Sequence, residues 1–307
     1  MMDAGNDNAI DIWIDLPFDL LQTLRLAHAI GEAGFRICIE PQDEKKLVLL
    51  KRIFSLDYKV GTAGAGKVSG LYLDHMTPVS RIGSIERPLI MPNAILNHCR
   101  ARWPRARGVD VSFAGLLTES RRAAINEWLR LSHLEELSVV PKKPAFISQL
   151  ARKIARKAGI SIADYVGTEN VKIYMSDQGR VFPRKSWNEA YYDLLLDSKF
   201  VLCPSGDFKS NGVVWTYRFF EAAICGAIPV IEEPCAAYEG YHYRLMSAPL
   251  DSLQWSREQA EHNFELARQR LTVDRDQLKA EILRLLPMPG VVADTVHKDY
   301  VNGIYAT

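Results

Sequence analysis

The stretch that decides the fold runs from Ser198 to Ile231 and reads SKFVLCPSGDFKSNGVVWTYRFFEAAICGAIPVI. Its first part, residues 198–204, is a continuous apolar run typical of a strand buried on both faces of a parallel sheet. A turn follows at Ser205-Gly206-Asp207, then a helix from Thr216 to Gly226 and a short strand at 227–231. This order of strand, turn, helix and strand predicts a β-α-β unit of a parallel α/β sheet.

The start of the predicted helix offers a site for an anion. In open α/β sheets ligands bind beyond the carboxyl ends of the strands, where Ser205 and Gly206 should lie. A helix N-terminus attracts anions through its free amides and dipole, and Arg218 adds a planar fork for phosphate oxygens. Glu221, one turn further on, could accept hydrogen bonds from the hydroxyls of a ribose. The alternative is that Arg218 and Glu221 form a surface ion pair, and their spacing does not decide between the two.

Three blocks in this part of the chain resemble the exostosin-like glycosyltransferases: Tyr191–Asp207, Tyr217–Ala222 and Gly226–Ile231. In that family a "SkFvLcPrG" strand and turn lead into an "RffEa…GciPVi" helix and strand. The resemblance implies a GT-B fold, in which two Rossmann-like lobes face each other across a cleft and the second binds most of the donor. It also implies inverting transfer from a nucleotide diphosphate sugar, usually UDP-linked, to a hydroxyl of a glycan or glycoconjugate. The sequence departs from the family at Ser205, where arginine is common, and in the loop 208–215.

The same resemblance implies roles for individual residues. Arg218 should meet the diphosphate and Glu221 the ribose. Residues 111–122 also resemble such enzymes, in the strand, glycine and arginines that open their donor lobe. There Gly115 would allow a close approach to the donor, and Arg121 or Arg122 would neutralise the departing phosphate. Two adjacent arginines at a helix start are equally typical of solvated surface. The predicted donor-binding residues are Gly115, Arg121, Arg122, Ser205, Gly206, Thr216, Tyr217, Arg218 and Glu221.

The catalytic base should come from a loop of the first lobe that faces the donor. Asp15, at the end of the first predicted strand, and Asp74 or His75, after a later one, are candidates by position. Their structural alternatives are that Asp15 caps the next helix and His75 is a hydrogen-bonded loop residue. Arg218 is expected to stabilise the leaving diphosphate together with the helix dipole, so the sequence predicts no metal and no other cofactor.

The remainder of the chain predicts two α/β lobes and a helical C-terminal part. Strands and helices alternate over the first hundred residues, and the pattern dissolves between 82 and 107, where we place the boundary between the lobes. The predicted domains are an N-terminal Rossmann-like lobe on the acceptor side (1–107), a nucleotide-sugar lobe (108–290) and a tail (291–307). The predicted strands lie at 10–16, 36–40, 70–74, 109–115, 137–140, 171–175 and 198–204, and the first two helices end near Gly34 and at 54.

Composition fits an ordinary globular protein. Of 307 residues, 48% are hydrophobic and 24% charged, and a formal net charge of +1 gives no case for a nucleic-acid partner. The basic stretch 142–157 could be a patch or a solvated helix face. No run approaches the ~20 apolar residues that span a bilayer, which leaves peripheral membrane contact open. Five cysteines without a C-x-x-C pair suit a reducing compartment, and no signal peptide is visible, so a cytoplasmic location is expected.

Two near-motifs compete with this interpretation. Residues 61–68 nearly spell a phosphate loop, but Val68 stands where the magnesium-binding hydroxyl belongs, and a strand is expected there rather than a helix. Asp274-Arg275-Asp276 has the D-x-D shape of metal-dependent glycosyltransferases, but its place between two helices favours capping. The alternative functions are therefore a catalytically idle carbohydrate- or partner-binding relative, or a phosphate-handling NTPase or kinase. The sequence leaves the oligomeric state open.

Overall fold

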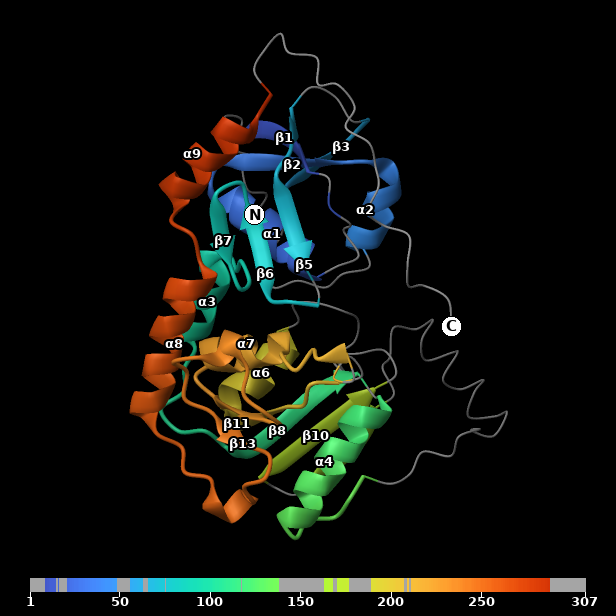
Figure 1. Cartoon of the computed structure of the whole chain (residues 1–307), viewed down its shortest axis with the longest axis vertical. Helices are drawn as coiled ribbons and strands as arrows, with labels where there is room; N and C mark the ends of the chain where they lie inside the picture. The colour runs from blue at the N-terminus through green and yellow to red at the C-terminus, as the bar shows by residue number, and fades with distance from the viewer. Residues whose placement is uncertain are drawn as a thin grey trace, which may run out of the picture.

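The computed structural model of the chain describes two α/β lobes, each built on a parallel sheet (Figure 1). The described residues are 9–14, 16, 21–48, 56–62, 66–74, 76–116, 118–137, 163–167, 170–176, 189–206, 209 and 211–287. The expected pair of Rossmann-like lobes is thereby confirmed. None of the described helices is both long and apolar enough to cross a membrane.

The first lobe is built on a four-stranded parallel sheet in the order β3-β2-β1-β4. Ile12 pairs with Ile37 across β1 and β2, and both side chains are fully buried against Leu24 and Ile30 of the neighbouring helix α1. Gly34, at φ +91°, closes α1 as the sequence predicts. The elements are β1 (Ile10–Ile14), α1 (Leu21–Glu32), β2 (Phe35–Ile39), α2 (Pro41–Val48), β3 (Tyr58–Val60) and β4 (Lys67–Val68).

A three-stranded antiparallel sheet follows, which the sequence pattern did not reveal. It consists of β5 (Leu71–Asp74), β6 (Val79–Ile82) and β7 (Ile85–Arg87). The strand expected at 70–74 therefore exists, but it belongs to this sheet and not to the parallel one. The region expected to be irregular also contains α3 (Asn93–Ala101). These strands are too short for their alternation to stand out among the prolines and arginines of the segment.

The second lobe contains a six-stranded sheet in the order β13-β12-β11-β8-β10-β9, parallel except at its β9 edge. β11 is buried on both faces as predicted: Val201 and Cys203 pack with α6 and α7, while Phe200 and Leu202 pack on the side of α4. The elements are β8 (Val109–Leu116), α4 (Glu119–Leu131), β9 (Ala163–Gly167), β10 (Val171–Ser176), α6 (Glu189–Asp197), β11 (Ser198–Cys203), α7 (Tyr217–Ile224), β12 (Ile228–Ile231) and β13 (Arg244–Leu245), with 3-10 turns at Ala236–Tyr238 and Leu250–Ser252.

The two last helices, α8 (Arg257–Leu271) and α9 (Arg275–Leu285), run along one side of both lobes (Figure 1). Helix α8 packs on the second lobe, whereas Leu278 and Ile282 of α9 join the core of the first. Asp274 caps α9 by accepting from the amides of Asp276 and Gln277, each at 3.0 Å, which accounts for the D-x-D sequence.

The cores do not follow the predicted limits of 1–107 and 108–290. Ile90 belongs to the core of the first lobe and Met91 to that of the second, so the chain changes core before residue 107. Helix α9 then returns to the first lobe because its apolar stripe covers α1 there. The carboxylate of Glu281 on this helix also accepts from the amide of Ser84, at 2.5 Å. The predicted tail, 291–307, lies outside the described residues.

Candidate functional site

The candidate site lies where β8 and β11 end and α7 begins. Ser205 and Gly206 follow β11 directly, and Gly206 has φ +97°, a left-handed conformation that glycine adopts without strain. Thr216 caps α7, and its hydroxyl accepts from the amide of Arg218 at 3.4 Å. Several of the predicted donor-binding residues are thus brought to one edge of the sheet, at the carboxyl ends of its strands, where α/β proteins bind ligands.

Arg218 is buried at this edge, with only 8% of the residue exposed. Its Nη2 donates to the carbonyl oxygen of Ala114 at 3.0 Å, and its guanidinium carbon lies 4.2 Å from the centre of the Phe113 ring. The buried Nε and Nη1 atoms have no hydrogen-bond partner among the described residues. Arg218 is therefore not the solvated surface ion pair that its spacing to Glu221 also allowed.

Gly115 makes room for this arginine. A Cβ atom added to Gly115 would lie 2.3 Å from Nη2 of Arg218 and 2.9 Å from the ring of Phe113, and neither distance is sterically allowed. The sequence predicted that this glycine lets a donor approach the backbone. In the structure the group that approaches it is the guanidinium expected to bind that donor.

Arg121 lies against Gly206 in the same way as Arg218 lies against Gly115. A Cβ on Gly206 would lie 3.0 Å from both Nε and Nη2 of Arg121, so the guanidinium rests against the turn after β11. Arg121 lies in the first turn of α4, where its amide donates to the hydroxyl of Thr118 at 3.4 Å. Arg122 is half-buried beside it on the same helix. Of the two adjacent arginines, Arg121 is thus the one placed on the turn.

Glu232, which the sequence did not single out, forms a hydrogen bond with the turn at Ser205 and Gly206. It follows β12, and its carboxylate accepts from the amide of Ser205 at 2.7 Å and from Nζ of Lys209 at 2.9 Å. Burial alone would raise the pKa of Glu232, but these bonds outweigh burial and hold that pKa below its ordinary value. The hydroxyl of Ser205 donates to the carbonyl oxygen of Val214 at 3.0 Å. A carboxylate directly after a buried strand, one strand away from the turn, was the available signal.

Glu221 has different partners from those expected. Its side chain is fully buried, Nη2 of Arg25 donates to one carboxylate oxygen, and the hydroxyl of Tyr191 donates to the other at 2.7 Å. Arg25 lies on α1 of the first lobe, and its guanidinium carbon is 5.6 Å from the centre of the Tyr217 ring. The ribose contact stays a prediction for a side chain that is fully buried.

Of the three candidate bases, only Asp74 lies within the described residues; Asp15 and His75 lie outside them. The carboxylate of Asp74 accepts from the amide of Met76 at 2.7 Å and from the hydroxyl of Thr77 at 2.5 Å. Burial acts to raise the pKa of Asp74, but these bonds prevail and lower it. Because a lowered pKa makes a weaker base, this geometry favours a turn-capping role for Asp74.

The near phosphate loop and the metal alternative receive no geometric support. Val68 lies in β4 and pairs with Ile14, so a strand follows the glycines, as expected, where a phosphate loop would have a helix. In the part of the chain that the structure describes, no three His, Cys, Asp or Glu side chains gather in a way that could hold a metal ion. The metal requirement itself is a matter for experiment.

Comparison with known proteins gives little beyond a likeness in fold. No protein-family model and no curated protein matches the chain. Among solved structures it is similar to AviGT4, a glycosyltransferase involved in avilamycin A biosynthesis, with 14% identity and a TM-score of 0.44 over 91% of this chain and 98% of that one. It is also similar to the GtfA/B complex, with 11% identity and a TM-score of 0.29 over 84% of this chain and 46% of that one. Scores this low carry no argument for an activity, so the function is argued from the site.

Proposed function

We propose that this chain is a glycosyltransferase that takes its sugar from a nucleoside diphosphate donor, with the diphosphate bound at the N-terminus of α7. The observation that supports this most is the side chain of Arg218. It is buried at the end of a parallel sheet, in the first turn of a helix, and two of its guanidinium nitrogens have no partner among the described residues. A buried cation with spare donors at such a place is suited to an anion with several oxygens.

The chemistry follows from where charge develops. A hydroxyl of a glycan or glycoconjugate acceptor attacks the anomeric carbon, the bond from that carbon to the diphosphate breaks, and a base takes the hydroxyl proton. The departing diphosphate gains negative charge, which Arg218 and the dipole of α7 would stabilise because both are already in position. Arg121, held on the turn at Gly206, would contact the same anion from α4. In-line attack inverts the anomeric centre, as the family resemblance implies.

The binding part of this proposal is tested by thermal unfolding in the presence of UDP, GDP, CMP and ATP, each with and without magnesium. A ligand at 100 times its dissociation constant stabilises the folded protein by about 2.7 kcal/mol, which is readily seen as a higher melting temperature. We expect one nucleoside diphosphate to stabilise the protein equally well in EDTA. Stabilisation by ATP only in the presence of magnesium would contradict the proposal and favour a phosphate-handling enzyme.

The transfer itself is tested with the nucleotide sugars of the diphosphate that binds. Release of nucleoside diphosphate that depends on an added glycan acceptor would support a transferase. Tight nucleotide binding without release, for every donor and acceptor offered, would instead identify a catalytically idle relative. Asp15→Asn and His75→Gln can be compared in the same assay, since the proposed base should come from the first lobe.

A further inference from the structure

A buried arginine of the first lobe, Arg25, contacts helix α7 at the candidate site. Arg25 of α1 and Glu221 of α7 lie 196 residues apart in the sequence, and neither side chain is exposed at all. The hydroxyl of Tyr191 donates to the second oxygen of the Glu221 carboxylate, at 2.7 Å. The pair therefore joins the two lobes at a point from which water is excluded.

Arg25 contacts α7 on both sides of Arg218. Its guanidinium bonds Glu221 and lies 5.6 Å from the ring centre of Tyr217, which is one helical turn earlier. Arg218 itself is held toward the second lobe by Ala114 and by the ring of Phe113. The first turn of α7 is thus held by the first lobe through Arg25 and by the second lobe through Arg218.

A second link joins the same segment to the first lobe. The indole nitrogen of Trp215 donates to the carbonyl oxygen of Met76, after β5, at 3.0 Å. Trp215 also packs edge-on against Tyr217, with ring centres 4.6 Å apart. The loop that leads into α7 and the first turn of α7 are therefore both docked on the first lobe.

A buried ion pair is a poor source of stability, because the cost of removing two charges from water offsets most of their attraction. It does fix geometry, because a planar guanidinium and a carboxylate bond well in few relative positions. We propose that Arg25 is a positioning residue: by holding Glu221 it sets where α7, and with it Arg218, lies relative to the first lobe. This rests on the proposed function, in which an acceptor on the first lobe must meet a donor held at α7 within reacting distance.

The variant that tests this is Arg25→Met combined with Glu221→Leu. Single replacements would leave one buried charge without its partner and could unfold the protein, whereas the double replacement removes both charges at similar volume. The matched control is Lys199→Met with Asp110→Leu, which removes a 2.6 Å ion pair within the second lobe. Both double variants should fold, but Arg25→Met/Glu221→Leu also removes the acceptor of the buried Tyr191 hydroxyl and should melt at a somewhat lower temperature than the control.

The first readout is the distance between the lobes and needs no activity. Spin labels are placed on cysteines at Lys59 and Arg130, whose side chains are 61% and 60% exposed, after Cys235→Ser removes the one cysteine that is not buried. We expect a narrow distance distribution in the wild type and the control, and a shifted or broadened one in Arg25→Met/Glu221→Leu. An unchanged distribution in that variant would overturn the proposal.

The second readout separates positioning from binding. Because Arg218 keeps its contacts with Ala114 and Phe113, the dissociation constant for pyrophosphate, which lacks the ribose that Glu221 is predicted to contact, should change less than about threefold while kcat falls at least about tenfold. An unaltered kcat would contradict a positioning role. If the wild type binds no nucleotide and transfers no sugar, the proposed function fails, and the distance measurement alone decides whether Arg25 positions α7.

Discussion

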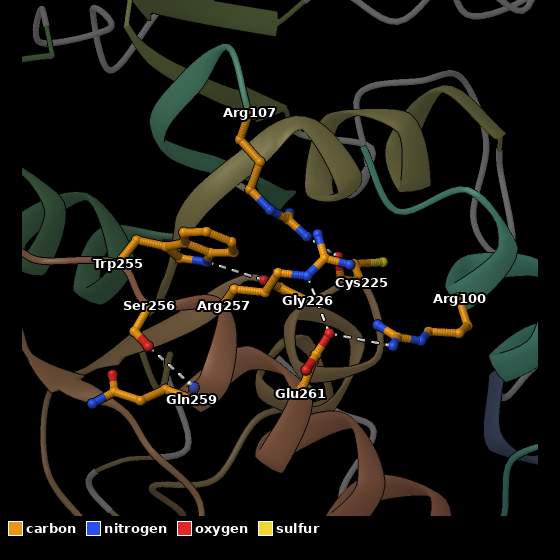
Figure 2. Close-up of polar contacts among 9 residues, drawn as sticks. All are labelled: Arg100, Arg107, Cys225, Gly226, Trp255, Ser256, Arg257, Gln259 and Glu261. Carbon is orange, nitrogen blue, oxygen red and sulfur yellow. Dashed lines mark hydrogen bonds and ion pairs between the residues drawn. The ribbon is translucent and has the colours of Figure 1, made fainter. Parts of the chain in front are cut away.

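Two arginines of equal burial lie at opposite ends of α7, and their surroundings differ. Arg107 and Arg218 are each 8% exposed, and each lies against a glycine where a Cβ would come within 2.5 and 2.3 Å of Nη2, at Gly226 and Gly115 respectively. Arg107 lies at the C-terminal end of the helix, where its Nη2 donates to the carbonyl oxygen of Cys225 at 2.9 Å (Figure 2). Arg218 is in the first turn at the N-terminal end, and its guanidinium contacts the carbonyl oxygen of Ala114 and the ring of Phe113.

The difference lies in how many donors each guanidinium has left. Arg107 donates to the carbonyl oxygens of Leu196 and Ser198, both at 2.7 Å, and of Cys225 at 2.9 Å, so only its Nε lacks a partner among the described residues. Arg218 donates to one carbonyl and keeps two nitrogens spare. Arg107 completes the fold by bonding carbonyls at helix ends, and burial lowers its pKa to about 10. Burial of an arginine alone therefore does not indicate a ligand site; spare donors at a helix N-terminus do.

The largest expected effect is on transfer by Arg218→Ala. Removing one preorganised group that stabilises developing charge typically lowers kcat about 10²- to 10³-fold, and we expect a loss of this size in kcat/KM. The free energy of unfolding should fall by no more than about 2 kcal/mol, because one hydrogen bond and one cation–π contact are lost. Steady-state kinetics and urea denaturation of the same preparation measure the two quantities. Near-normal turnover would remove Arg218 from the mechanism.

Arg107→Ala should show the reverse pattern. Several buried carbonyl oxygens would lose their donor, so the free energy of unfolding should fall by about 3 kcal/mol. Nucleotide affinity of the protein that remains folded should stay at the wild-type value. Calorimetric titration at 10 °C, well below the melting temperature, makes this comparison. A selective loss of nucleotide affinity would mean that the two arginines are not distinct in role.

Substituting Gly115 or Gly226 by alanine tests the same difference between Arg218 and Arg107 without removing a charge. Gly115→Ala should displace the guanidinium of Arg218 and reduce kcat/KM about tenfold, with overpacking costing about 1 kcal/mol of stability. Gly226→Ala meets Trp103 as well as Arg107 and sits at φ +75°, so it should cost about 3 kcal/mol of stability while leaving kcat unchanged. Equal effects of both substitutions on kcat would contradict the account.

The smallest expected effect concerns Glu232. Because the bonds from Lys209 and Ser205 depress its pKa below the ordinary 4.5, the stabilisation it gives is present above pH 4.5 and is lost as the pH falls through the lower folded-state value. Glu232→Gln should therefore lower stability by less than about 1 kcal/mol at pH 7, and the difference from the wild type should vanish in acid. Glu265→Gln, in an exposed i, i+3 pair with Arg268, is the surface control and should lower the free energy of unfolding at pH 7 by no more than about 0.5 kcal/mol. A difference that stays constant from pH 7 down to the acid limit of the titration would show that the charge is not responsible.

The fold of the second lobe could be predicted because local signals agree there. A continuous apolar strand, a capping threonine and a closing glycine all indicate the same β-α-β unit, and the structure places its elements within a residue or two of the predicted ones. The antiparallel strands and the return of α9 to the first lobe could not be predicted. Both depend on which core an apolar stripe covers, and that choice involves residues far apart in the sequence.

Where the candidate residues lie in the fold could be predicted from the sequence, but which groups they contact could not. Arg218, Ser205 and Gly206 were selected because strand ends and helix starts meet at one edge of a parallel sheet. The contact between Gly115 and Arg218 arises only from tertiary packing. The same holds for the ion pair between Glu221 and Arg25 of the other lobe. No spacing rule along the chain connects Arg25 to Glu221 across 196 residues.

The most direct test of the central claim compares two ligands in two proteins. The nucleoside diphosphate that stabilises the wild type best and its parent nucleoside are titrated by calorimetry into the wild type and Arg218→Ala. If Arg218 binds the diphosphate, the wild type should bind the diphosphate at least about a hundredfold more tightly than the nucleoside, and most of that ratio should disappear in the variant. The same ratio in both proteins would show that the phosphates bind elsewhere and would contradict the account.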